Sequence, residues 1–149
     1  MNIAGLQKMT LLDFPGHIAC TVFTAGCNFR CPFCHNASLV IGQTPEQMEE
    51  EEFFSFLSKR RGLLDGVAVT GGEPLLQKEI APFLRRVHEC GFAVKLDTNG
   101  SFPDRLAHIL EGGLADYVAM DIKNSPARCA ETAVLPAGWH KGVPKCPPR

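Results

Sequence analysis

The sequence has 149 residues, with 15 Lys and Arg against 16 Asp and Glu, and a formal net charge of −1. That length suffices for one domain with a hydrophobic core, and the balanced charge gives no electrostatic basis for binding nucleic acid or an anionic membrane. We find no bilayer-spanning apolar run and no signal peptide, so we expect a cytoplasmic protein with neither partner.

Short segments rich in β-forming residues alternate with helical patterns up to residue 121. Strands are predicted at 18–24, 67–70, 92–97 and 117–121, and helices at 44–61, 80–90 and 103–111. The strand segments are apolar almost throughout, as expected of strands buried on both faces. This alternation predicts an α/β fold in which parallel strands are joined by right-handed βα crossovers.

The first two helices carry signals at their ends and faces. Thr44 and Gln47 form a predicted capping box, and the acidic start and basic end of 44–61 match the helix dipole. We interpret the acidic run at 49–52 as a solvated helix face rather than a docking patch for a partner. The second helix has one apolar stripe, formed by Ile80, Phe83, Leu84 and Val87.

The cysteines give the strongest chemical signal. There are seven of them, and three lie in a C-x3-C-x2-C spacing: Cys27, Cys31 and Cys34. Thiolates are the usual ligands of iron–sulfur clusters, and three can hold a 4Fe–4S cluster whose fourth iron stays open. Structural zinc is the alternative, but zinc needs four ligands, and His35 directly follows Cys34, which is awkward for one tetrahedron. The spacing therefore favours iron and sulfur over zinc.

Polar motifs follow each of the four predicted strands. The cysteine loop follows the first strand, and the other motifs are Thr70-Gly71-Gly72-Glu73-Pro74, Asp97-Thr98-Asn99-Gly100 and Asp121-Ile122-Lys123. The carboxyl ends of parallel strands form the pole where ligands bind. Taken singly, each motif is equally well explained as a turn or a surface ion pair. Together they predict one binding site.

Several of these motifs resemble a known family. The cysteine spacing, with aromatic Phe33 before the third cysteine, resembles the radical S-adenosylmethionine superfamily, and Gly71-Gly72-Glu73-Pro74 resembles its second motif. Segments 10–16, 34–36, 97–100 and 120–123 resemble the activating enzymes of glycyl-radical proteins. The nearest resemblance is to the activating proteins of anaerobic ribonucleoside-triphosphate reductase, and pyruvate formate-lyase activating enzymes are near relatives.

The resemblance implies a fold, two cofactors and a set of site residues. The fold would be an incomplete radical-SAM partial TIM barrel, and the cofactors would be a 4Fe–4S cluster on Cys27, Cys31 and Cys34 and S-adenosyl-L-methionine. Backbone carbonyls around Gly71, Gly72 and Glu73 would accept hydrogen bonds from the amino group of S-adenosylmethionine. Phe33 would lie near its adenine. The remaining cofactor-binding residues would be Asp97, Asn99, Asp121 and Lys123.

The resemblance also implies an oxidoreductase reaction under anaerobic conditions. A flavodoxin or ferredoxin would reduce the cluster, and the sulfonium cofactor would be cleaved to a 5′-deoxyadenosyl radical. That radical would take a hydrogen atom from a glycine of a glycyl-radical enzyme. Two other functions stay open: a radical enzyme acting on a small molecule, such as 7-carboxy-7-deazaguanine synthase, and an inactive fragment that binds a cluster or zinc.

The resemblance ends at about residue 126, as if the chain were a truncated member of the family. Beyond it the apolar periodicity stops, and prolines occur at Pro126, Pro136, Pro144, Pro147 and Pro148. We therefore expect an incomplete barrel at 1–126 and an irregular or disordered Pro-rich tail at 127–149 that adds no strand to the sheet.

Overall fold

The architecture is an open five-stranded sheet, seen in a computed structural model that describes residues 1, 3–40, 48–125 and 128–134. The strands lie in the order of the chain: β1 (Ile3–Thr10), β2 (Ala19–Thr24), β3 (Gly66–Gly71), β4 (Ala93–Thr98) and β5 (Tyr117–Met120). The pairs β2–β3, β3–β4 and β4–β5 are parallel. These pairings confirm the predicted α/β fold with parallel βα repeats, and the strands of the described residues form an open sheet rather than a closed barrel.

Strand β1 was not predicted. It pairs antiparallel with β2, with two irregularities in the register, and its residues alternate poorly between apolar and polar. Ile3 is buried, whereas residues 7–9 are exposed. An edge strand needs only part of one face to be apolar, so the sequence carries little periodic signal there.

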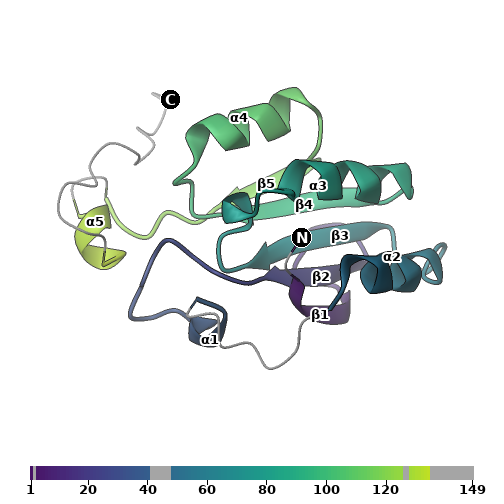
Figure 1. Cartoon of the computed structure of the whole chain (residues 1–149), viewed down its shortest axis with the longest axis horizontal. Coiled ribbons are helices and arrows are strands. Elements are labelled where there is room, and N and C mark those ends of the chain that lie inside the picture. The colour runs from purple at the N-terminus through teal and green to yellow at the C-terminus, as the bar shows by residue number, and fades with distance from the viewer. Residues whose placement is uncertain (2, 41–47, 126–127, 135–149) are drawn as a thin grey trace.

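Three helices cover one face of the sheet: α2 (Glu50–Ser58), α3 (Ile80–Glu89) and α4 (Pro103–Glu111). Figure 1 shows all three on the same side of the strands. Alternate strand residues, among them Val67, Val69, Val94 and Leu96, join the helices in one apolar core. The predicted stripe of α3 is fully inside this core, because Ile80, Phe83, Leu84 and Val87 are all buried.

Helix α2 is shorter than the predicted helix at 44–61. The N–H of Met48 donates to the carbonyl of Ile3 at 3.0 Å, and this bridge to β1 holds Met48 and Glu49 extended until the helix begins at Glu50. The predicted capping residues Thr44 and Gln47 lie outside the described residues. The helix ends at Ser58, so Lys59, Arg60 and Arg61 follow it instead of occupying its last turn.

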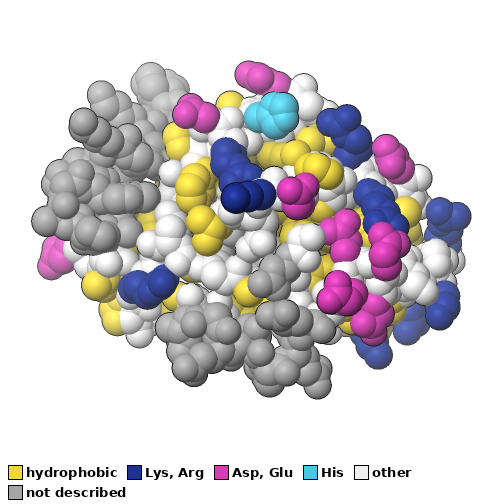
Figure 2. Space-filling view, in the orientation of Figure 1, with side chains coloured by type: hydrophobic (Ala, Val, Ile, Leu, Met, Phe, Trp, Pro, Cys, Tyr) yellow, Lys and Arg dark blue, Asp and Glu magenta, His cyan; other side chains and the backbone are white. Residues whose placement is uncertain are grey.

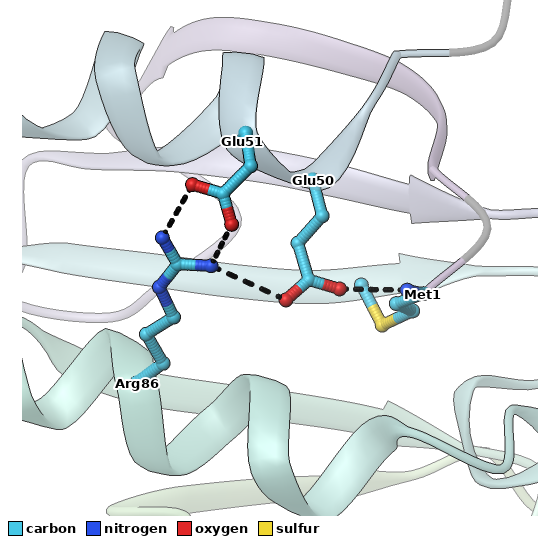
Figure 3. A network of polar contacts seen from close by, with 4 residues as sticks. All are labelled: Met1, Glu50, Glu51 and Arg86. Atoms are coloured by element: carbon cyan, nitrogen blue, oxygen red, sulfur yellow. Dashed lines mark hydrogen bonds and ion pairs between the residues drawn. The ribbon is translucent and has the colours of Figure 1, made fainter.

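The acidic start of α2 is tied to α3. Glu51 binds both terminal nitrogens of Arg86, at 2.5 and 2.7 Å, and Glu50 binds the amino group of Met1 at 2.6 Å (Figure 3). The guanidinium of Arg86 also stacks over Phe54, 3.9 Å from the ring centroid. Figure 2 shows basic and acidic side chains interleaved over this side of the molecule. The acidic run is therefore partly paired as well as solvated.

Short helices lie at the carboxyl ends of the strands: α1 (Ala37–Val40), the 3₁₀ helix η1 (Pro74–Leu76) and α5 (Cys129–Thr132). Helix α5 forms where irregular chain was expected. Ala133 after it is fully buried, its carbonyl accepts the N–H of Arg30 at 2.9 Å, and Asn124 donates to Thr132 at 2.8 Å. These contacts give the segment apolar and polar partners that composition does not reveal.

The rest of the predicted tail, 126–127 and 135–149, lies outside the described residues, and the domain limit at 126 stays a prediction. Within the described ranges, β5 pairs only with β4 and no strand follows it. No helix in those ranges combines the length and the apolar character needed to cross a bilayer.

Candidate active site

All of the predicted site residues except Glu73 line one cavity of about 370 Å³ at the carboxyl pole of β2 to β5. Ligand pockets generally start at about 300 Å³, so this one is at the small end of the range. Its walls include Cys27, Phe33, Gly71, Asp97 and Asp121. Thr70, predicted at the same pole, lies there too. The other predicted residues in the wall are Cys31, Cys34, Gly72, Asn99 and Lys123.

Backbone hydrogen bonds hold the cysteine loop over this pole. The N–H of Gly26 donates to Leu39 at 2.8 Å, and the carbonyl of Gly26 accepts the N–H of Glu73 at 2.9 Å. The side chain of Arg30 donates hydrogen bonds to the carbonyls of Cys27 and Phe29, and these bonds close the loop on itself. The loop is therefore attached to α1 and to the turn after β3.

The three loop cysteines are free and half-buried. Burial raises the pKa of the Cys27 thiol, although the N–H of Phe29, 3.3 Å from its Sγ, lowers it in part. Burial also raises the pKa of Cys31, and the nearby ammonium of Lys123 lowers it. Metal binding requires thiolates, so a bound cluster would displace the thiol protons.

The spacing of these thiols bears on which metal group they suit. Within the described residues, no three His, Cys, Asp or Glu side chains lie close enough to hold one metal ion. A zinc ion needs thiolates about 4 Å apart, because its bonds to sulfur are about 2.3 Å long. A 4Fe–4S cluster binds each thiolate on a separate iron atom. Three free thiols line one cavity and suit the three iron atoms of such a cluster that bind protein thiolates.

Close backbone packing requires the two glycines at the end of β3, Gly71 and Gly72. A Cβ on Gly72 would lie 1.9 Å from the carbonyl oxygen of Gly26, and one on Gly71 would lie 2.4 Å from the nitrogen of Thr24. Gly71 also has a φ of 111°, which favours glycine. This close approach of backbone to backbone brings the turn against the cysteine loop.

Glu73 is the one predicted site residue whose side chain turns away from the cavity. It is fully buried, and its carboxylate accepts hydrogen bonds from Leu75 N–H (3.0 Å), Thr98 hydroxyl (2.8 Å) and Asn99 N–H (2.7 Å). Burial raises its pKa, and these hydrogen bonds lower it in part. The side chain therefore connects the turn after β3 to the end of β4, while the proposed cofactor contact through its backbone stays a prediction.

An amide network that the sequence did not reveal links β4 to the cysteine loop. Asn99 donates to Oδ1 of Asn28 at 3.0 Å and lies 3.8 Å from Sγ of Cys27. Asn28 in turn donates to the hydroxyl of Ser101 at 2.8 Å. Asn28 sits between two cysteines and Ser101 just after Gly100, so their positions inside motifs were the only available signal. His35, Asn36, Phe29 and Val40 were also not chosen, yet they line the cavity.

An Asp–Lys pair lies on β4, and a second one lies just after β5. On β4, Lys95 donates to Oδ1 of Asp97, and just after β5, Lys123 donates to Oδ2 of Asp121. Lys123 also lies 5.9 Å from the ring centroid of Phe33. Burial opposes the charge of Lys123, but Asp121 and the thiolate forms of Cys31 and Cys34 outweigh it, so its pKa is raised. The cavity wall thus presents the carboxylates of Asp97 and Asp121 and the positive charge of Lys123.

Comparisons with known proteins show the family to which the chain belongs. The profile of the Radical SAM superfamily matches residues 21–135, which include the whole cavity wall. A protein of Methanocaldococcus jannaschii named as a glycyl-radical enzyme activating enzyme is 34% identical over 126 residues, covering 81% of this chain and 50% of that protein.

Two further relatives carry different names. The pyruvate formate-lyase-activating enzyme of Clostridium pasteurianum is 33% identical over 128 residues, covering 83% of this chain and 52% of that enzyme. The 7-carboxy-7-deazaguanine synthase of Methanopyrus kandleri is 34% identical over 130 residues, covering 74% of this chain and 51% of that enzyme. The chain thus spans about half the length of these relatives.

Among solved structures, QueE from Escherichia coli matches with a TM-score of 0.55 and 18% identity, over 67% of this chain and 52% of that one. At this identity the likeness concerns the fold alone. It agrees with the open, mostly parallel sheet described above.

Proposed function

The chain belongs to the radical SAM superfamily, and we propose that it is a glycyl-radical activating enzyme that acts through a 4Fe–4S cluster on Cys27, Cys31 and Cys34. The superfamily uses this cluster and S-adenosylmethionine, the two cofactors predicted from the sequence. When bound, the two together supply a 5′-deoxyadenosyl radical that takes a hydrogen atom from the substrate.

One observation carries the proposal: three free thiols and the side chains of Asp97, Asp121 and Lys123 share a single cavity. The thiols suit iron, while carboxylates and an ammonium group suit a cofactor that has an amine, a carboxylate and ribose hydroxyls. Asp97 and Asp121 would accept hydrogen bonds from the amine or the hydroxyls. Lys123 would pair with the carboxylate.

The remaining residues of the wall would hold the cofactor in place. Phe33 is half-exposed at the cavity and would offer a ring face to the adenine. The turn at Gly71 and Gly72 places main-chain groups in the wall, which suits contacts with the amine. Asn99 holds the cysteine loop through Asn28, so it would position the loop relative to the cofactor.

The partner is proposed to be a glycyl-radical enzyme of the anaerobic ribonucleotide reductase or pyruvate formate-lyase type. Support comes from the relatives named as activating enzymes and from the motifs at 34–36 and 97–100 that resemble theirs. A flavodoxin or ferredoxin is proposed as the electron donor, in an anaerobic cytoplasm.

A small-molecule substrate is the second candidate. It is favoured by the relative named 7-carboxy-7-deazaguanine synthase, whose identity to this chain is as high as that of the activating enzymes. A cluster-binding chain without activity is the third, because the match spans about half of each relative.

Product analysis tests the proposal. The reconstituted chain, reduced without oxygen, should convert S-adenosylmethionine to 5′-deoxyadenosine and methionine, whereas Cys31→Ala should not. Adding an anaerobic ribonucleotide reductase or a pyruvate formate-lyase should then produce a glycine-centred radical in that partner. Cofactor cleavage without any glycyl radical would favour the small-molecule candidate. A cluster without cleavage would favour the inactive chain.

A further inference from the structure

Lys95 is a buried lysine that the proposed function does not use. It lies in the middle of β4, in register with Ala68 of β3 and Tyr117 of β5. Its neighbours Val94 and Leu96 face the helices, so Lys95 lies on the opposite face of the sheet. Only 8% of the residue is exposed, whereas lysine is almost never fully buried unless it is paired.

The burial of Lys95 is explained by one small neighbour and one acidic partner. Ala68, beside Lys95 in the register, has a short side chain, which leaves room over the sheet. The ammonium donates to Oδ1 of Asp97, two residues further along and therefore on the same face of the strand. Because an unpaired buried charge is strongly unfavourable, Lys95 needs the Asp97 carboxylate.

Asp97 joins this pair to the cavity. Its side chain is a third exposed and lines the wall together with the three cysteines. Its other carboxylate oxygen, Oδ2, has no hydrogen-bond partner among the described residues. Lys95 itself is not part of the wall, so it touches the cavity only through Asp97.

The pair just after β5, Asp121 and Lys123, provides an internal comparison. Lys123 also binds an aspartate two residues away, but both members of that pair line the cavity. Lys123 is thus placed to meet a ligand directly, and Lys95 is placed behind its aspartate. Near thiolates or a cluster, an Asp97 carboxylate without Lys95 would be repelled and would turn away from the wall.

We propose that Lys95 is a positioning residue that holds the Asp97 carboxylate toward the cavity for the binding of S-adenosylmethionine. The inference rests on the proposed function, since it takes this cofactor as the ligand of the cavity. Lys95 would thus raise the affinity for the cofactor although it contacts neither the cysteines nor the cofactor.

The test measures the dissociation constant for S-adenosylmethionine on the anaerobically reconstituted chain. Removing partners that orient a ligating group commonly costs about 10- to 100-fold. We expect a loss of that size in Lys95→Met and in Asp97→Asn, with unchanged iron and sulfide content. Lys95→Arg, which keeps the charge, should recover most of the affinity. Lys59→Met, an exposed lysine after α2, is the matched control and should bind as the wild type does.

The double variant Lys95→Met/Asp97→Asn separates positioning from a merely structural role. If Lys95 acts through Asp97, the double variant should bind no more weakly than Asp97→Asn alone. Independent, additive losses would overturn the inference, as would a Lys95→Met affinity within twofold of the wild type. If Lys95→Met does not fold, Lys95→Gln is used, with the same criteria.

If the wild type itself binds no S-adenosylmethionine, the proposed function fails together with the inference. Normal binding by the wild type with an unaffected Lys95→Met removes the inference alone.

Discussion

The two faces of strand β4 belong to two regions that are stabilised in different ways. On one face, Val94 and Leu96 are fully buried beneath helices in a core made of many interchangeable apolar groups. On the other face, Lys95 and Asp97 form one specific pair that leads to the cavity. The core region holds the fold by summed burial, while the cavity region depends on contacts between specific residues. Variants in the two regions should therefore fail in different ways.

The largest expected effect is in the cavity. Replacing Cys27, Cys31 or Cys34 by Ala should abolish cluster binding, because three thiolates are needed for three irons. Cys90→Ala is the control, since Cys90 lies at the end of α3 and away from the wall, and it should keep full iron and sulfide content. Thermal unfolding of the apo chains should change little in all four variants. A loop-cysteine variant that still binds a full cluster would contradict the assignment.

The next effect is in the core. Leu84→Ala removes a fully buried side chain from α3 and should cost about 2–5 kcal/mol of unfolding free energy, whereas Leu63→Ala, at an exposed position, should cost little. Urea unfolding measures both. The folded fraction of Leu84→Ala should still load iron in the wild-type ratio. A cluster defect larger than the folding defect would mean that the two regions are not separable.

Glu73 lies between the regions, and its effect depends on pH. Burial raises its pKa above the ordinary value of 4.5, so the folded chain holds the proton more tightly than the unfolded chain. The stability it contributes is present in full below the unfolded pKa and is lost as the pH rises through the folded pKa. Glu73→Gln, which mimics the neutral acid, should gain stability relative to the wild type as the pH rises from about 4 to about 8. Urea unfolding at several pH values measures this gain, and parallel curves for the two proteins would refute it.

The smallest effect is expected at the exposed ion pair of α2 and α3. Arg86 binds Glu51 through two hydrogen bonds, which lower the pKa of the Glu51 carboxyl, but water competes for both groups. Glu51→Gln should leave the melting temperature unchanged within error at high salt, with at most a small decrease at low salt. A large decrease that persists at high salt would show that this surface stabilises the fold more than its exposure implies.

The sequence predicted the parallel strands and the pole of the site because both leave periodic or positional signals. Apolar runs such as 67–70 mark buried strands, and motifs at strand ends mark the pole. Strand β1 and helix α5 leave no such signal, because β1 is an irregular edge strand and α5 depends on a contact between Ala133 and Arg30. The start of α2 depends in the same way on the bridge from Met48 to Ile3.

Within the site, the sequence predicted which residues take part better than it predicted where their side chains point. The cysteines were identified by their spacing and Asp97 by its position at a strand end and its motif, yet only the structure shows that Glu73 turns inward and that Gly72 packs on Gly26. Asn28, Ser101 and Lys95 act through side-chain hydrogen bonds to other motifs, and such bonds follow from tertiary structure rather than from local pattern.

The most direct test of the central claim is electron paramagnetic resonance on the reduced, anaerobically reconstituted chain, with iron and sulfide determined on the same sample. The account predicts about four irons and four sulfides per chain and a 4Fe–4S signal that changes when S-adenosylmethionine is added. Stoichiometric zinc without labile sulfide, or a cluster signal that S-adenosylmethionine leaves unchanged, would contradict it.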